Sequence, residues 1–276
     1  GLPTQVGIGI PMATDIAFAL GTLAILGSRI PSSLKALLVA LAVIDDLTAI
    51  IIIAVFYTAK LSILYLSAAL LLWLALAAAA RYFRIRSLTI YLLTGAVIWY
   101  LMLRSGVHAT IAGVILAFAL PSSETQDDEE SPSFQLEHHL HKPVAFMILP
   151  IFALCNTGVV IGADWAKELT QANSSGILGG LVIGKPIGIT LFSLIAVLAG
   201  ICRLPSDMSW RHVLGAGMLG GIGFTMSIFI ANLAFPADPA LINESKMAIL
   251  LASLVSGLVG FIWLRSFGMQ AVMEED

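Results

Sequence analysis

Three carboxylates and one lysine lie inside stretches that otherwise read as membrane-spanning helix. They are Asp15, Asp45, Asp46 and Lys185. An ionisable side chain at the centre of a bilayer costs at least about 2.5–3.5 kcal/mol, so it is rare unless it lines a pathway or pairs with another group. Carboxylate oxygens are hard ligands that suit small, hard cations. These residues therefore indicate a route by which a cation crosses a membrane.

Asp45 and Asp46 are consecutive, so on one helix their side chains point about 100° apart and at most one faces a pocket directly. Two close carboxylates in a partly desolvated site cannot both ionise easily. The same oxygens then hold either a proton or a small cation, and this competition couples opposite fluxes if the site faces alternate sides. Lys185 could pair with a carboxylate when the cation is absent, or offset the carbonyl ends of half-helices.

Glycine and proline interrupt two of the apolar stretches, at 7–11 and at 215–223. Each interruption precedes polar residues, namely Thr14 and Asp15 in the first stretch and Thr225 and Ser227 in the second. A matching pair of interrupted segments is typical of a transporter site built from inverted repeats, because freed backbone groups are tolerated only beside protein or cavity water. The alternative for the glycines is close packing of helices.

The composition predicts an all-α, polytopic membrane protein. Of 276 residues, 59% are hydrophobic and 11% are charged, well below the roughly 25% charged residues of soluble domains. The net charge of −3 argues against a nucleic-acid partner, and no motif calls for a cofactor. Apolar runs predict nine spans in one transmembrane domain over 1–276, at about 3–25, 32–57, 64–82, 87–100, 105–119, 143–161, 176–200, 210–235 and 245–265.

The distribution of lysine and arginine predicts the orientation of these spans. Nine of the basic residues fall on one side of the alternating spans and four on the other, which makes the first side, and the C-terminus, cytoplasmic. An acidic and histidine-rich cytoplasmic loop is predicted at about 120–141. Its Glu137, His138 and His141 form a candidate pH sensor, because histidine titrates near neutral pH. A solvated polar segment is the alternative, and the spacing is weak support for a metal site.

Several of these segments resemble the NhaA family of sodium/proton antiporters, one of the inverted-repeat transporter families. The resemblance covers essentially the whole chain, in the family's order. Its motifs resemble the family's fourth, fifth, eighth, tenth and eleventh helices, and here they are ATDIAFALG at 13–21, IDDL at 44–47, SGVHAT at 105–110, GKP at 184–186 and GIGFTMSIFI at 221–230.

The resemblance implies a twelve-helix transporter rather than an enzyme, with two discontinuous helices that cross within an inverted-repeat bundle. Such a protein lies in the inner membrane of bacteria and exchanges cytoplasmic sodium or lithium for external protons under pH regulation. By matching motif, Asp45 and Asp46 would carry the cation and the proton. Thr14 and Asp15 would line the crossing, and Lys185 would balance its charge. Glu137, His138 and His141 fall on the family's pH-sensing region.

The sequence departs from the family at its beginning. The family has about three helices and a β-hairpin before the segment that opens this chain, and these build the homodimer contact. We therefore expect either a fragment that lacks the dimer-forming N-terminal part or a chain whose missing part is supplied by a partner chain, and we expect these 276 residues to be inactive alone. Its partners would be sodium or lithium, protons and the lipid bilayer.

Two other functions are compatible with intramembrane carboxylates. An aspartyl protease could use Asp15 and Asp45 as a dyad that shares one proton. Such enzymes need a Gly-x-Gly-Asp arrangement, whereas Gly223 precedes Phe224, and Lys185 would have no role. A sodium-coupled solute symporter would need more polar residues around its pocket than the sequence offers.

Overall fold

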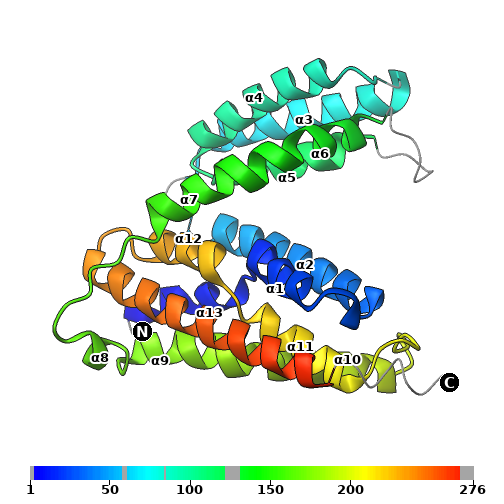
Figure 1. Ribbon diagram of the computed structural model, residues 1–276. Coiled ribbons are helices and arrows are strands. Elements are labelled where there is room, and N and C mark those ends of the chain that lie inside the picture. The colour runs from blue at the N-terminus through cyan, green and yellow to red at the C-terminus, as the bar shows by residue number, and fades with distance from the viewer. Residues whose placement is uncertain (1–2, 58–60, 84, 122–130, 268–276) are drawn as a thin grey trace. The chain divides into compact units, whose positions relative to one another are not determined.

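The computed structural model describes residues 3–57, 61–83, 85–121 and 131–267, and these residues form helices without any strand (Figure 1). Two compact units are present. Unit 1 comprises the described residues of Gly1–Ala49 and Phe152–Asp276, and unit 2 those of Ile50–Ile151. The two boundaries between the units fall within the helices α2 (Ser32–Phe56) and α7 (Leu149–Asn156).

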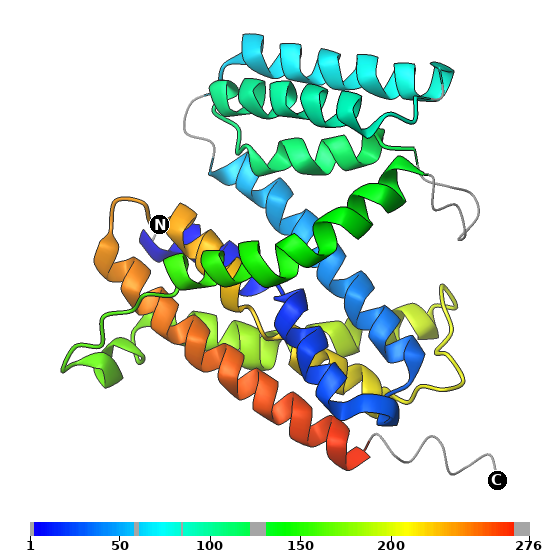
Figure 2. The same ribbon diagram turned by 45° about the horizontal axis from the view of Figure 1, so that its top comes forward.

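Unit 1 contains the interrupted segments. Its other elements are the 3-10 helix η1 (Pro3–Met12), α1 (Ile16–Leu26), η2 (Gly27–Arg29), α8 (Trp165–Glu168), α9 (Ala172–Gly179), the π-helical turn η4 (Gly180–Gly184), α10 (Lys185–Leu198), α11 (Trp210–Gly220), α12 (Phe224–Ala234) and α13 (Pro239–Phe267). Both views show α13, in orange to red, beside α9 and α11 (Figures 1 and 2). A buried apolar cluster joins α1, α2, α11 and α13 through Leu23, Leu34, Leu38, Leu219 and Leu264.

Unit 2 is built around three neighbouring helices, α3 (Ile63–Phe83), α4 (Leu88–Ser105) and α5 (Thr110–Ala119), which lie side by side in cyan to green (Figure 2). Its other elements are α6 (Pro132–Pro143) and the π-helical turn η3 (Val144–Ile148). Buried Ala69, Leu76, Tyr91 and Ile98 contribute to its core. The Tyr91 hydroxyl donates to the carbonyl of Ile85 at 2.8 Å, so the one polar group of this side chain is satisfied.

Six helices of the described chain are long and apolar enough to cross a membrane, or seven if the bent pair α11–α12 counts as one span. This makes the chain a polytopic membrane protein, but the nine predicted spans are not confirmed. The predicted span at 105–119 corresponds to α5, whose ten residues cover about 15 Å, half of the hydrocarbon thickness. The segment at 143–161 corresponds to the end of a helix that runs from α6 through η3 into α7, and the first part of this helix is polar.

Two breaks in the helices of unit 1 fall at the interrupted segments. The first break is at 13–15, where Asp15 has an extended backbone between η1 and α1. The second is at 221–223, where α11 and α12 are bent by 46°. Glycine and proline precede the first break and glycines form most of the second, as expected for residues that weaken helices.

Candidate functional site

The two helix breaks of unit 1 contact each other through hydrogen bonds. The backbone N–H of Asp15 donates to the carbonyl of Ile222 at 2.6 Å. The Ser227 hydroxyl, fully buried, donates to the carbonyl of Ile10 at 2.8 Å. Backbone groups that lose their helical partners must find others when they are buried. Each interrupted segment therefore supplies a hydrogen-bond donor for a backbone carbonyl of the other.

Asp15 joins the beginnings of two helices. One carboxylate oxygen accepts from the backbone N–H of Phe18 at 3.2 Å, which caps α1. The other accepts from the backbone N–H of Thr225 at 3.0 Å and from its hydroxyl at 2.5 Å, in the first turn of α12. The N-terminus of a helix carries partial positive charge. Two such ends thus compensate a carboxylate that is only 4% exposed.

Lys185, the first residue of α10, reaches the C-terminal end of α11 with its side chain. Its Nζ is 3.0 Å from Oδ2 of Asp45, and it donates to the Thr14 hydroxyl at 2.5 Å and to the carbonyl of Gly220 at 3.0 Å. Gly220 is the last residue of α11, so its carbonyl belongs to the negative end of that helix. The three donors of the ammonium group therefore have three oxygen partners.

Thr14 connects these oxygens. Its hydroxyl lies 2.7 Å from Oδ2 of Asp45 and 2.9 Å from the carbonyl oxygen of Gly220, and it accepts from Lys185. A hydroxyl has one hydrogen, so Thr14 donates to the carboxylate or to the carbonyl at any moment. An exchange between the two acceptors requires only rotation of this hydroxyl.

Asp46 has a different environment from its neighbour. Its carboxylate is close enough to Asp45, Asp15 and Lys185 to interact electrostatically with all three. Its Oδ1 is buried and has no hydrogen-bond partner among the described residues. A buried carboxylate oxygen without a partner is costly, so it is a candidate position for a ligand or a proton.

Close backbone packing sets the position of Lys185. The residue follows the π-helical turn η4, a rare element that is frequent at functional sites. The next residue, Pro186, packs against α11, where a Cβ atom on Gly217 would lie 2.9 Å from its Cα. Sequence reasoning identified the Gly-Lys-Pro segment but missed both the π turn and the Gly220 carbonyl. No local pattern distinguishes Gly220 from its neighbouring glycines.

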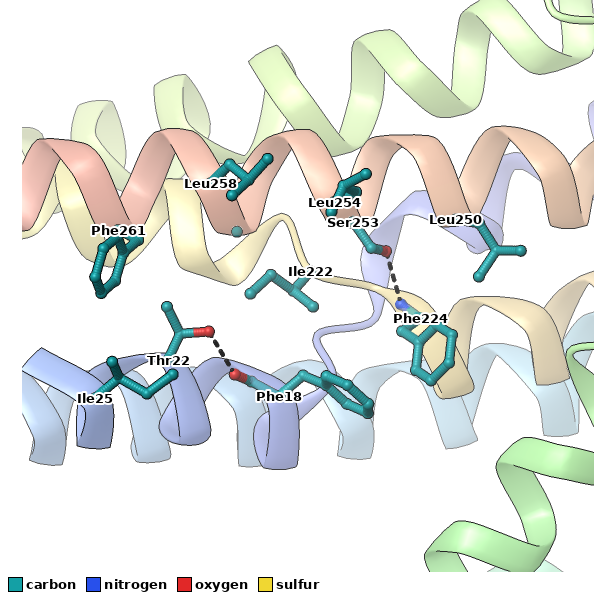
Figure 3. Close-up of a pocket in the computed structure, with 11 residues that line it drawn as sticks. Phe18, Thr22, Ile25, Ile222, Phe224, Leu250, Ser253, Leu254, Leu258 and Phe261 are labelled. Carbon is teal, nitrogen blue, oxygen red and sulfur yellow. Dashed lines mark hydrogen bonds between the residues drawn. The ribbon is translucent and has the colours of Figure 1, made fainter.

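A pocket in unit 1 is separate in its chemistry from the charged cluster. It has a volume of about 460 Å³ and lies among α1, α13 and the break between α11 and α12 (Figure 3). Its lining is mostly aliphatic and aromatic. The Thr22 hydroxyl donates to the carbonyl of Phe18, and the Ser253 hydroxyl accepts from the N–H of Phe224 (Figure 3). With these polar groups already paired and no charge in the lining, the pocket does not suit a cation.

The predicted pH-sensing residues belong to unit 2 and are not part of this cluster. Glu137, His138 and His141 are exposed on α6, and His138 stacks on Phe134 with ring centroids 6.2 Å apart. The acidic run at 127–130 lies outside the described residues. Within the described chain, no three His, Cys, Asp or Glu side chains are arranged to hold a metal ion.

Comparison with known proteins identifies related chains. The family model described as Na⁺/H⁺ antiporter 1 matches residues 1–264. A Na⁺/H⁺ antiporter NhaA of Dechloromonas aromatica is 64% identical over 97% of this chain and 69% of its own length. Similar antiporters of Flavobacterium johnsoniae and Cytophaga hutchinsonii are each 56% identical over 96% of this chain and over 68% and 67% of their own lengths. These matches do not bear out the expected absence of an N-terminal part.

Proposed function

Because the chain belongs to the Na⁺/H⁺ antiporter 1 family, we propose that it exchanges sodium ions for protons across a membrane, with Asp45 and Asp46 as the carriers. Lithium is proposed as a second cation. The direction proposed is export of cytoplasmic sodium against entry of external protons. A cofactor has no role in this exchange, because the carboxylates themselves bind both transported ions.

One observation supports these carriers above all others. Asp45 is held by the Lys185 ammonium group, while the adjacent Asp46 has a buried carboxylate oxygen without a hydrogen-bond partner among the described residues. A small cation that binds between the two carboxylates would use this free oxygen and would replace the ammonium at Asp45. The first change lowers the electrostatic energy of an otherwise incomplete site, and the second keeps a positive charge beside Asp45.

The exchange then follows from competition for the same oxygens. When the cation leaves, protons or the Lys185 ammonium neutralise the carboxylates in its place. Thr14 supports either state, because its hydroxyl can turn from Asp45 to the carbonyl of Gly220. Thr225 and Ser227 support the site less directly, since they bind Asp15 and the carbonyl of Ile10 and so hold the two breaks together.

We propose that the two breaks are the discontinuous helices of an inverted-repeat bundle. Their mutual hydrogen bonds support this arrangement, because such transporters place broken helices against each other near the middle of the membrane. The proposed location is the bacterial inner membrane with a cytoplasmic C-terminus, which agrees with the bacterial origin of the relatives and with the lysine and arginine distribution.

Regulation by pH is proposed for the exposed side chains of α6. Glu137 and His141 are four residues apart and therefore share one face of the helix, and His138 lies next to Glu137. Imidazole side chains change charge between pH 5 and 8. Such a cluster can report cytoplasmic pH without taking part in the exchange itself.

The comparisons support neither a solute symporter nor an aspartyl protease. A protease dyad would require Asp15 to share a proton with Asp45. Both oxygens of Asp15 already accept hydrogen bonds from the first turns of α1 and α12. A carboxylate that serves two helix ends is poorly placed to act as a general acid or base.

The test is sodium-induced proton release from the purified protein and exchange in vesicles. Asp45→Asn and Asp46→Asn should each abolish both signals, because an amide neither carries a proton at this site nor supplies a negative ligand. Asp164→Asn is the matched control, since Asp164 is exposed and its side chain makes no cap hydrogen bond.

Parental exchange by either site variant would exclude that residue as a carrier. Loss of exchange in the Asp164 control as well would show that the assay responds to carboxylate removal in general.

A further inference from the structure

A cationic and aromatic cluster in unit 2 is separate from the proposed transport site. It consists of Tyr65 in the first turn of α3 and of Tyr100 and Arg104 in the last turns of α4. The Arg104 Nη1 donates to the Tyr100 hydroxyl oxygen at 3.3 Å, and Nη2 donates to that of Tyr65 at 3.4 Å. The guanidinium carbon also lies 5.2 Å from the centre of the Tyr65 ring. Three contacts therefore hold one exposed guanidinium.

The positive charge of Arg104 is not neutralised within the described part of the chain, where no carboxylate lies within ion-pair distance of it. Each tyrosine oxygen accepts from the guanidinium, which leaves the phenolic hydrogen free to donate elsewhere. No acceptor for either hydrogen is found among the described residues. The cluster thus combines a fixed cation with two unused O–H donors and the remaining guanidinium N–H groups.

The position of the cluster restricts what can bind it. Helices α3 and α4 are both membrane-spanning candidates, and all three residues lie at the same end of the pair. This end must therefore lie near one bilayer surface, where tyrosine and arginine side chains are enriched. Large apolar side chains beside the cluster are exposed, among them Leu64 at 75%, Leu103 at 52% and Trp99 at 50%. These side chains suit acyl chains below a charged headgroup.

We propose that Arg104, Tyr65 and Tyr100 form a binding site for the phosphate group of an anionic membrane phospholipid. The guanidinium fork and the two phenol donors match the several acceptor oxygens of a phosphodiester, and the charges are complementary. The exposed leucine and tryptophan side chains would contact the acyl chains of the same lipid. A soluble phosphate would gain nothing from this apolar surround, so the proposed occupant is the lipid.

The test is the thermal stability of the purified chain in uncharged detergent after addition of phosphatidylglycerol or of phosphatidylcholine with the same acyl chains. Phosphatidylglycerol should raise the Tm more than phosphatidylcholine does. Arg104→Gln should lower the apparent affinity for phosphatidylglycerol at least about tenfold, because it removes charge-assisted hydrogen bonds to the phosphate group. The control is Arg265→Gln, which removes an exposed arginine from the last turn of α13.

A second variant, Tyr65→Phe with Tyr100→Phe, keeps both rings and removes only the hydroxyl groups. Added phosphatidylglycerol should raise the Tm of this variant less than it raises that of the parent. Arg104→Lys should recover only part of the affinity for phosphatidylglycerol that Arg104→Gln loses, because an ammonium lacks the planar fork. Equal losses in Arg104→Gln and Arg265→Gln would overturn the proposal, since they would indicate attraction to charge alone. So would an unchanged effect in the tyrosine variant, or the same rise in Tm with inorganic phosphate.

Discussion

The two units hold their charges in different ways. In unit 2 the charged side chains of α3 and α4 are Arg81 and Arg104, and each stands in the last turn of an unbroken helix. In unit 1, Asp15 lies at a helix break and Lys185 directly follows a π-helical turn. An unbroken helix uses its backbone groups internally and has none to offer a buried charge. A broken one frees carbonyl and amide groups, and in unit 1 such groups bind the charges of Asp15 and Lys185.

This comparison is tested most strongly at Lys185. Lys185→Ala leaves Asp45 and the carbonyl of Gly220 without their cation, and loss of one partner from a buried pair typically costs about 3–5 kcal/mol. We expect a large drop in the Tm, measured by thermal unfolding in detergent, and a smaller drop for Lys185→Arg.

An alanine variant of Lys185 as stable as the parent would contradict the comparison, since it would mean that the ammonium is solvated. Arg81→Ala in unit 2 is the control, and as an exposed residue at a helix end it should change the stability by less than about 0.5 kcal/mol.

The next effect in size is expected at Asp15. Asp15→Ala removes the acceptor for the first turns of both α1 and α12. Since one N-terminal cap typically contributes about 0.5–2 kcal/mol, two should contribute about 1–4 kcal/mol. Thermal unfolding measures this loss, and Asp164→Ala serves as its control.

Amide hydrogen exchange distinguishes the two capping roles of Asp15. The variant should lose protection at the beginnings of both helices, which lie far apart in the sequence. Faster exchange in α1 alone would show that the carboxylate does not stabilise α12.

Glycine substitutions sharpen the comparison, because the same change to alanine should lower the stability in unit 1 and should not lower it in unit 2. A Cβ on Gly221, in the break, would collide with the carbonyl of Leu181 and with the Ser256 hydroxyl. Gly221→Ala should therefore destabilise unit 1 by about 1–3 kcal/mol, as overpacking does. A Cβ on Gly113, within the unbroken α5, would have no atom within 4 Å, so Gly113→Ala should not destabilise.

Both glycine variants are compared with the parent by thermal unfolding. Equal stability of the two variants would show that the backbone contact between η4 and the break has little energetic importance.

The smallest effect on stability is expected for the histidines of α6. His138 and His141 are exposed, so replacing both with glutamine should leave the Tm nearly unchanged. If they sense pH, the exchange activity should keep its maximal rate while its pH profile shifts, because the imidazole groups that would sense pH are gone. Exchange in vesicles across a pH series measures the profile.

An unchanged profile would favour the alternative of a solvated polar segment. Complete loss of exchange at every pH in a folded variant would instead place the histidines on the ion path.

The sequence alone determined the class of this protein and the residue types of its candidate site. Long apolar runs, their interruption by glycine and proline, and the intramembrane Asp45, Asp46 and Lys185 are all local features. Hydropathy and helix-breaking residues act over a few turns, so the bounds of α2 and α3 could be predicted to within a residue or two. Short or bent segments such as α5 were predicted less well, because their ends depend on neighbouring helices.

Only the tertiary structure decided which groups meet. Thr14 contacts Lys185 across 171 positions, and Asp15 contacts Thr225 across 210 positions. No periodicity encodes such pairs, because they arise when two broken helices pack together and exchange their unpaired backbone groups. The same packing selects the carbonyl of Gly220, among several similar glycines, as the partner of the lysine. The chemistry of the site is therefore local in the sequence, while its geometry is a property of the packed bundle.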